Sequence, residues 1–329
     1  MRAVNNLLVL YTGGTIGMLE TPAGLAPAGG FDARMREHLS KSADAPQLNW
    51  SLRELDPLLD SANMQQANWL AMRDAIVEAV ERDGHDGVLV LHGTDTLAYS
   101  AAALSFLLLG LPVPVLLTGS MLPAGAPDSD AWDNLEGALR LFEQGLEDGV
   151  QLYFHGQLLH GARASKLRSE AFDAFKALAR HREGDKAGSI PGELDYRVPR
   201  QPVNLAVVPV FPGLQAQHLR ALLGSGVQGL LLECYGSGTG PSDDQGLLDA
   251  LRDARQRGVM IAAISQCPEG AVEFGTYAAG SRLRDTGLVS GGGMTREAAL
   301  GKMFALLGAG LDAQTAERWF ALDLCGERA

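Results

Sequence analysis

The sequence has few cysteines, few aromatic residues and no long apolar segment. Its three cysteines, Cys234, Cys267 and Cys325, are far apart and form no CxxC pair, which indicates reduced thiols rather than a disulfide framework. No apolar run reaches the roughly 18 residues that span a bilayer. The first residues hold one Arg and a short apolar run, which does not predict a secretory signal. We therefore expect a cytoplasmic protein that does not bind membranes.

Basic residues are also scarce. There are 27 Lys and Arg against 39 Asp and Glu, so the formal net charge is −12. A nucleic-acid-binding surface normally carries a basic patch, so we expect no nucleic acid partner. The seven histidines include no HExxH or other close-spaced ligand set, and the sequence predicts no metal site.

What the sequence does contain is a regular alternation of short apolar runs and longer helical segments. The runs are continuously apolar, as in parallel strands buried on both faces, and lie at 7–11, 87–92, 113–119 and 150–156. Helical spacing of apolar residues predicts the intervening helices at 66–82, 97–109 and 131–146. This βαβ pattern predicts an α/β fold whose larger N-terminal domain, 1–190, has a doubly wound, mostly parallel sheet.

A second, smaller α/β domain is predicted after a linker. Residues 191–204 are rich in proline and mixed charge without a period, which is typical of a linker. The alternation then resumes over 205–329. We expect strands at 205–211, 229–236 and 258–266, and helices near 215–223, 243–257 and 295–308. Thr295 is suited to cap the last of these helices.

Glycines and small hydroxyl residues follow each of the first three predicted strands. The segments are Thr12 to Thr15, His92 to Thr96 and Thr118 to Met121. Ligands of open parallel sheets bind beyond the carboxyl ends of the strands, so these segments should meet at one edge. Ordinary turn and cap residues are the alternative, which explains one segment better than three together. Phosphate binding is less favoured, because "GGTIG" lacks the lysine of a P-loop.

A threonine hydroxyl at that edge becomes a nucleophile only if a base takes its proton. Lys166, in "RASKLRSEAF", follows the fourth predicted strand and can lie at the same edge. A desolvated lysine has a lowered pKa and then acts as a base. The alternative is a solvated surface lysine, which is the commoner use of this residue type.

The motifs "TGGTIG", "HGTDT", "TGSMLP" and "ASK" together resemble the bacterial asparaginase/glutaminase amidohydrolases. The resemblance continues through "CYGSGTGP", "ISQC" and "GGMTREAALGKM". It implies hydrolysis of L-asparagine to L-aspartate and ammonia without a metal or organic cofactor, by a homodimer or homotetramer. The wording of "DSANMQ" is similar to that of the cytoplasmic type.

The resemblance also implies roles for four catalytic residues. Thr15 matches the threonine that attacks the amide carbon and forms an acyl-enzyme. Thr94 matches the threonine that positions water with help from Lys166. Asp95 matches the aspartate that receives the α-ammonium of the substrate, although by its position it is also suited to cap the helix at Leu97.

Further positions are implied to bind the substrate. Ser61, in "DSANM", matches the serine that holds the α-carboxylate, although from its sequence alone it is an ordinary loop residue. Backbone N–H groups near Thr94 and Ser120 are the expected oxyanion donors. Gly14 and Gly93, in the same motifs, complete the predicted substrate-binding set.

The sequence departs from the family pattern at several places. Leu25 stands where relatives often carry a tyrosine that closes over the nucleophile, which leaves open what activates Thr15. Ala62 stands where many relatives have a glutamine or a second polar residue, and Thr239 stands where many have an asparagine that reaches the active site of a neighbouring subunit. Some members have an allosteric asparagine site, and there Glu233 replaces an arginine, so we expect no such regulation. A broader amidohydrolase, acting on glutamine, D-asparagine or a peptide-linked amide, and an inactive amino-acid sensor remain alternatives.

Overall fold

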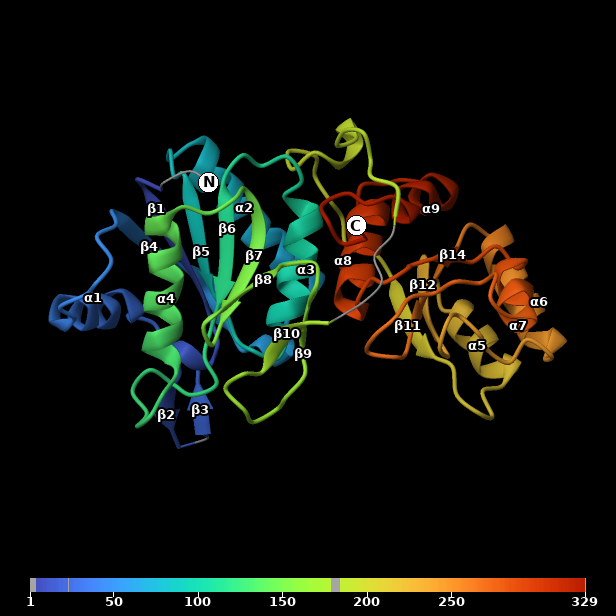
Figure 1. Cartoon of the computed structure of the whole chain (residues 1–329), viewed down its shortest axis with the longest axis horizontal. Coiled ribbons are helices and arrows are strands. Elements are labelled where there is room, and N and C mark those ends of the chain that lie inside the picture. Colours follow the sequence, from blue (N-terminus) through green and yellow to red (C-terminus); the bar gives the residue numbers. More distant parts are fainter. Residues whose placement is uncertain (1–3, 23, 179–183, 329) are drawn as a thin grey trace. The chain divides into compact units, whose positions relative to one another are not determined.

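The structure is a computed structural model that describes residues 4–22, 24–178 and 184–328. It divides into two compact units, Met1–Ala177 and Leu178–Ala329. Figure 1 shows the chain with its elements labelled. Within the described ranges, none of the helices combines the length and the apolar character that crossing a lipid bilayer requires.

The first unit contains a six-stranded sheet in the order β4-β1-β5-β6-β7-β8. Neighbouring strands are parallel up to β7, and β8 pairs with it in the antiparallel direction. The strands are β1 (Leu7–Gly13), β4 (Trp50–Leu59), β5 (Gly87–Leu91), β6 (Pro114–Thr118), β7 (Gly149–Phe154) and β8 (Gln157–His160). The predicted doubly wound, mostly parallel sheet is therefore confirmed.

Helices cover both faces of this sheet. They are α1 (Phe31–Lys41), α2 (Gln66–Glu81), α3 (Leu97–Leu107) and α4 (Ala131–Gln144). Buried side chains of α1 and α4, such as Phe31 and Leu135, pack with Val9 of β1 and Leu89 of β5. The alternate residues of the strands point to the opposite face, where α3 packs against β6 and β7 and against α2. Figure 1 shows α4 and α3 on opposite sides of the strands.

Several elements of the first unit have no counterpart among the predicted ones. The edge strand β4 carries Arg53, Glu54 and Asp56 and is largely half-buried or exposed, so it has no continuous apolar run. Two short pairs, β2 (Leu19–Thr21) with β3 (Gly24–Ala26) and β9 (Ala164–Lys166) with β10 (Phe175–Ala177), are antiparallel. Strands of three residues are too short to show a period.

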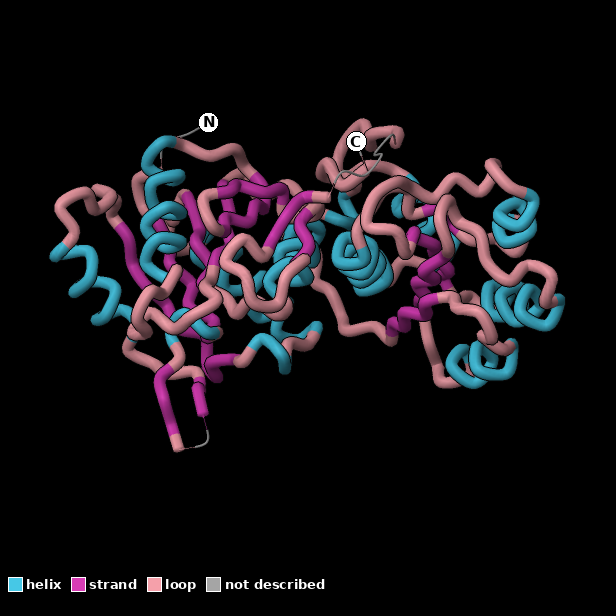
Figure 2. The backbone as a smooth tube through the Cα atoms, turned by 60° about the horizontal axis from the view of Figure 1, so that its bottom comes forward, coloured by secondary structure: helices cyan, strands magenta, loops and turns pink. Residues whose placement is uncertain are grey.

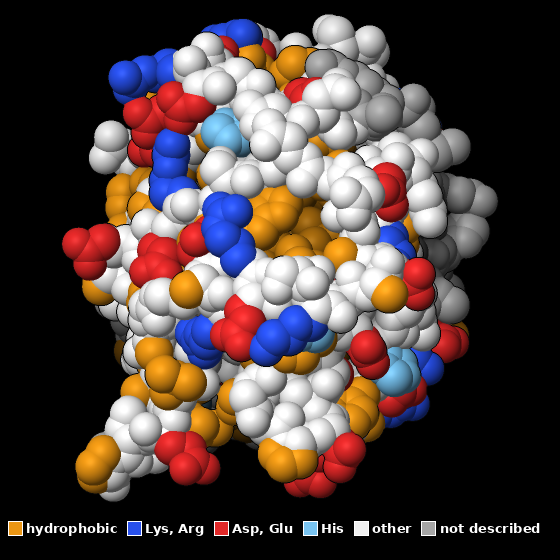
Figure 3. Space-filling view, turned by 90° about the vertical axis from the view of Figure 1, so that its left-hand side faces the viewer, with side chains coloured by type: hydrophobic (Ala, Val, Ile, Leu, Met, Phe, Trp, Pro, Cys, Tyr) orange, Lys and Arg blue, Asp and Glu red, His pale blue; other side chains and the backbone are white. Residues whose placement is uncertain are grey.

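Charges are mixed on the surface of the first unit that includes α1. Figure 3 shows basic and acidic side chains interspersed on the face that it presents. Within α1, Arg36 pairs with Asp32 and Lys41 pairs with Glu37, both at a spacing of four residues. Such exposed pairs stabilise a helix locally by a few tenths of a kcal/mol.

The second unit has a four-stranded parallel sheet in the order β11-β12-β13-β14. Its strands are β11 (Leu205–Pro209), β12 (Gly229–Cys234), β13 (Met260–Ser265) and β14 (Val289–Ser290); its helices are α5 (Ala216–Leu223), α6 (Gln245–Gln256), α7 (Ala278–Arg284), α8 (Arg296–Gly308) and α9 (Ala313–Ala321). The Thr295 hydroxyl accepts a hydrogen bond from the Ala298 N–H, so the predicted cap of α8 is confirmed. The short helices α7 and α9 were not predicted.

Candidate active site

The first strand ends in a glycine pair that carries Thr15 into a 3₁₀ turn, η1 (Thr15–Gly17). Gly14 has φ +82°, and a Cβ added to it would lie 2.3 Å from the amide N of Gly93. Only glycine permits this backbone-to-backbone approach. The turn is braced by Arg34, which donates to the Gly17 carbonyl at 3.1 Å. Thr15 is half-buried, and its hydroxyl makes no hydrogen bond with the part of the chain described.

The next strand exit places a lysine, a threonine and an aspartate in direct contact. Lys166 Nζ donates to Thr94 Oγ1 at 2.9 Å and to Asp95 Oδ1 at 3.0 Å. Lys166 arrives from β9, after the chain has turned back through β8. Thr94 is 6% exposed, whereas the side chain of Asp95 is 62% exposed. One carboxylate oxygen of Asp95 accepts from Lys166, and the carboxylate as a whole is open to solvent.

Ser61 lies against the same strand exit. It begins the turn η2 (Ser61–Asn63) after β4 and is 5% exposed. Thr96 Oγ1 donates to the Ser61 carbonyl at 2.9 Å. A Cβ added to Gly93 would lie 2.4 Å from Ser61 Oγ. Gly93 therefore lies against both Gly14 and Ser61. Thr15 directly follows Gly14 in the chain, and Thr94 directly follows Gly93.

Ser120 lies on the third strand exit, and its hydroxyl is engaged within its own turn. Ser120 Oγ donates to the Leu122 carbonyl at 2.5 Å. The amides of Met121 and Leu122 donate to Asp130, at 3.0 and 3.1 Å. The Ser120 side chain is thus used to shape the turn, which leaves the backbone as the part of Ser120 that can face a ligand.

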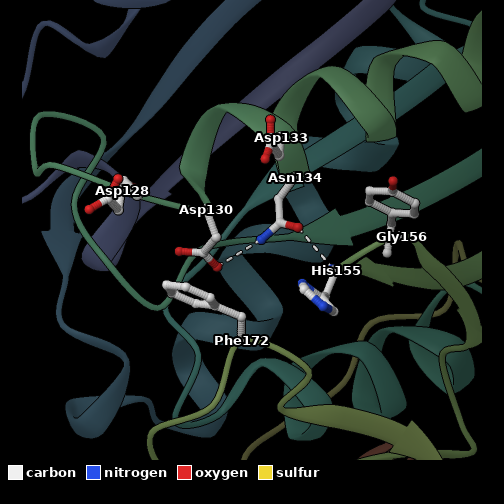
Figure 4. A pocket seen from close by; sticks show the side chains of 9 residues that line it. Asp128, Asp130, Asp133, Asn134, His155, Gly156 and Phe172 are labelled. Carbon is white, nitrogen blue, oxygen red and sulfur yellow. Dashed lines mark hydrogen bonds between the residues drawn. The ribbon is translucent and has the colours of Figure 1, made fainter.

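A pocket of about 350 Å³ lies next to this turn. Figure 4 shows Asn134 between Asp130 and His155 at its centre. Asn134 donates to Asp130 at 3.0 Å and accepts from the His155 amide at 2.9 Å. The lining residues are Asp128, Ser129, Asp130, Asp133, Asn134, Tyr153, His155, Gly156 and Phe172. The polar atoms of Asp130 and Asn134 form hydrogen bonds with backbone groups and with each other. We therefore interpret these two residues of the pocket as stabilising the Ser120 turn.

The structure corrects the expected helix cap at Asp95 and shows where Leu25 lies. Asp95 is not the cap of α3, because the N-cap position falls on Thr96. Leu25 lies on the β2–β3 hairpin, half exposed and opposite Glu20. Figure 2 shows this hairpin projecting from the body of the first unit. An apolar side chain there supplies no proton acceptor.

Tyr11 is the nearest tyrosine to Thr15 along the chain, and it is fully buried. Its hydroxyl donates to the Ala28 carbonyl at 3.1 Å, and a Cβ on Gly17 would lie 1.9 Å from it. Burial raises the pKa of Tyr11 to about 12, so this hydroxyl keeps its proton at neutral pH. Tyr11 therefore supports the η1 turn at Gly17 and the segment after β3 at Ala28, and it does not act as a base.

Sequence reasoning assigned no role to the buried side chains behind the second strand exit. His92 contacts Ser100, which contacts Trp69, and each of these bonds is shorter than 3 Å. The only signal was the histidine that opens "HGTDT". Among the residues described, no group of three or more His, Cys, Asp or Glu side chains has an arrangement that could hold a metal ion.

Comparison with known proteins agrees with the motifs. The family model "Asparaginase, N-terminal" matches residues 6–189, and "Glutaminase/Asparaginase C-terminal domain" matches residues 204–320. Together these models span most of the chain. The chain therefore belongs to the asparaginase/glutaminase family.

Individual relatives align with nearly the whole of this chain. L-asparaginase 1 of Escherichia coli K12 is 34% identical over 333 residues, which are 98% of this chain and 97% of that protein. The human 60 kDa lysophospholipase is 34% identical over 98% of this chain and 61% of its own length. The solved structure of the thermostable L-asparaginase from Thermococcus kodakarensis has a TM-score of 0.84 at 31% identity, covering 98% of this chain and 99% of that one.

Proposed function

We propose that this protein hydrolyses L-asparagine to L-aspartate and ammonia through a threonine acyl-enzyme. The observation that carries the proposal is the contact of Lys166 with both Thr94 and Asp95, immediately beside the Gly14–Gly93 contact that holds Thr15. Hydrolysis of a zwitterionic amide requires an oxygen nucleophile, an amine and a carboxylate, which here belong to one edge of the sheet. The full-length similarity to proteins named L-asparaginase supports the same substrate.

The proposed reaction has two halves. Thr15 Oγ attacks the side-chain amide carbon, its proton passes to the leaving nitrogen, and ammonia departs from an aspartyl ester of Thr15. Water positioned by Thr94 then attacks the ester, and Lys166, bonded to Thr94 Oγ1, holds that hydroxyl in place and stabilises negative charge. Release of L-aspartate restores the Thr15 hydroxyl, so atoms and protons balance without a cofactor.

Substrate recognition follows from charge and exposure. The open carboxylate of Asp95 suits the α-ammonium, and Ser61 suits the α-carboxylate. The amide N–H of Thr94 donates to no residue within the described ranges, which supports its role as an oxyanion donor, together with the backbone at Ser120. Gly14 and Gly93 bring these groups close enough to reach one small ligand.

Ammonia release from L-asparagine by the purified protein tests the proposal. Thr15→Ala is expected to lower kcat/KM by about 10⁴-fold or more, as loss of a nucleophile does, and Thr15→Ser keeps a hydroxyl as the matched control. Full activity in Thr15→Ala would remove the assigned nucleophile. Tight asparagine binding without turnover in the unaltered protein would favour the sensor instead.

A substrate panel separates the narrower alternatives. It contains L-asparagine, L-glutamine, D-asparagine and a peptide-linked asparagine, compared by kcat/KM. A lysophospholipid joins the panel because one relative carries that activity in its name. A higher kcat/KM for any of these than for L-asparagine would replace the proposed substrate.

Assembly, location and domain limits are part of the same proposal. We propose a cytoplasmic homodimer or homotetramer, with a catalytic domain at 1–190 and a second domain from 205 after a linker at 191–204. Analytical ultracentrifugation measures the assembly, and limited proteolysis within 191–204 tests the linker. A monomer with full activity would contradict the oligomer.

A further inference from the structure

Behind the second strand exit lies a chain of three hydrogen bonds, of which the two made by His92 are buried and the one made by Trp69 is partly buried. Trp69 on α2 meets Ser100 on α3 at 2.9 Å, Ser100 Oγ meets His92 Nε2 at 2.8 Å, and His92 Nδ1 meets the Gly93 carbonyl at 2.7 Å. His92 and Ser100 are both 0% exposed. The chain therefore runs from a helix on the outside of the sheet to the peptide that precedes Thr94.

The direction of every bond in this chain is fixed from its two ends. An indole N–H only donates, so Ser100 Oγ accepts from Trp69. A carbonyl only accepts, so His92 Nδ1 carries the proton. Nε2 then has a free lone pair, and the Ser100 hydroxyl donates to it. Burial also lowers the pKa of His92 to about 4, so the ring is neutral at neutral pH.

The last bond sets the orientation of the Gly93–Thr94 peptide. This peptide is trans, because Asp56–Pro57 is the cis bond found in the described ranges. In a trans peptide the C=O and the N–H point in opposite directions. With its carbonyl held by the His92 ring, the peptide presents the Thr94 N–H on the side away from the buried His92 and Ser100. This N–H donates to no acceptor in the part of the chain that the structure describes.

We propose that His92 is a positioning residue that aims the Thr94 N–H at the oxyanion of the reacting amide, with Trp69 and Ser100 fixing its tautomer. This inference rests on the proposed function. It acts through the backbone, because His92 has no exposed surface from which to touch the substrate. A donor turned away from the oxyanion weakens the transition state more than the bound substrate, so the effect falls on kcat.

Two substitutions at His92 each keep one of its two hydrogen bonds: the bond that Nδ1 donates to the Gly93 carbonyl, or the bond that Nε2 accepts from the Ser100 hydroxyl. Asn places an N–H where Nδ1 lies, and Gln places an amide where Nε2 lies. Each variant loses one buried hydrogen bond, so both should show a similar fall in Tm. His92→Gln is expected to lower kcat about 10- to 100-fold with KM for L-asparagine nearly unchanged, since a misplaced oxyanion donor costs less than a deleted one. His92→Asn is expected to retain at least about tenfold more of kcat than His92→Gln.

Equal kcat in the two variants, or losses that follow Tm, would overturn the positioning role. If both His92 variants fail to fold, Trp69→Phe and Ser100→Ala provide the same comparison, and an undiminished kcat in both would overturn the relay. The tautomer is read separately from the ¹⁵N NMR shifts of His92: protonated Nδ1 supports the inference and protonated Nε2 refutes it. Lack of asparagine hydrolysis by the unaltered protein would instead refute the proposed function, while the NMR result would still report the relay.

Discussion

The two units each hold a lysine in contact with a carboxylate, and the surroundings of these lysines are opposite. Lys166 lies at a strand exit, where it contacts the buried Thr94 and the exposed Asp95. Lys302 in α8 is 0% exposed and donates to the carbonyls of Phe320 and Leu322 and to Glu327. Within the described residues, the carboxylate beside Lys166 keeps one oxygen without a hydrogen bond, whereas the three N–H groups of Lys302 meet three acceptors.

The same contrast holds for the carboxylates. Glu327 is 0% exposed and accepts the amides of Leu324 and Cys325 in addition to Lys302. At the end of β12, Glu233 is bound by the guanidinium of Arg296 through two bonds of 2.5 and 2.8 Å. Asp95, by contrast, is 62% exposed and binds Lys166 through one oxygen. An ion pair whose polar atoms all have partners joins segments of the chain, and a pair with an exposed oxygen is available for chemistry. The number of hydrogen-bond partners therefore distinguishes the two kinds of ion pair better than the residue type does.

The sharpest way to break this comparison is Lys166→Met. The loss of an amine that holds Thr94 Oγ1 and stabilises negative charge should lower kcat/KM by about 10²–10³-fold. Tm should hardly move, because partly exposed pairs contribute only about 0–1 kcal/mol. Steady-state ammonia release and thermal unfolding measure the two quantities. A variant that stays active but unfolds early would place Lys166 in the structural class.

Lys302→Met should show the reverse pattern. Removing one partner of a buried pair leaves Glu327 charged and unpaired, which costs about 3–5 kcal/mol of unfolding free energy. The kcat of the folded fraction should stay close to that of the unaltered protein. Urea unfolding and active-site titration give both values.

The double variant Lys302→Met with Glu327→Gln is the control for this prediction. It removes both charges, so it should recover part of the lost stability. A double variant less stable than Lys302→Met alone would contradict the account of Glu327 as an unpaired buried charge.

The pH dependence of stability sharpens the comparison further. Burial raises the pKa of Glu327, but the Lys302 charge and its hydrogen bonds reverse this and hold it at about 2, below the ordinary 4.5. Burial also lowers the pKa of Lys302. A depressed carboxyl pKa adds stability that is fully present above about pH 4.5 and is lost as the pH falls through about 2.

Comparison with Glu327→Gln isolates this contribution. The difference in unfolding free energy between the unaltered protein and the variant should shrink by about 3 kcal/mol between pH 6 and pH 2. Urea unfolding at several pH values measures it. A difference that is constant with pH would show that the Glu327 carboxylate does not contribute to stability through its pair with Lys302.

The smallest expected effect concerns the cap of α8. Thr295→Ala removes the acceptor of the Ala298 N–H and should cost about 1 kcal/mol without changing kcat. Thr295→Ser keeps the hydroxyl and serves as the control. A loss of activity larger than the loss of stability would place this helix start in the function of the protein.

The sequence was enough to predict the buried strands and the rim, because β1, β5 and β6 are continuous apolar runs that end in glycine and hydroxyl residues. It did not predict β4, because the charged residues of this edge strand interrupt its apolar pattern. Ser61 directly follows the end of that strand, in η2. The route of Lys166 through β8 and β9 was equally hidden, because strands of three or four residues have no period.

Side-chain partnerships were also beyond the sequence. The contact of His92 with Ser100 joins residues that lie eight positions apart, and that of Trp69 with Ser100 joins two helices. Hydrophobic spacing marks Trp69 as a core residue but does not say that its N–H needs an acceptor. The resemblance to a family supplied the roles of Thr15 and Asp95, which residue patterns alone left open.

The contact of Gly14 with Gly93 constrains how this site can change. An added methyl group at Gly14 would meet backbone, and one at Gly93 would meet Ser61. Engineering of a new substrate preference therefore has to hold both positions invariant and draw its diversity from the side chains around them. In a library that randomises every position at this edge of the sheet, most variants would be unable to bring the Gly14 and Gly93 backbones together.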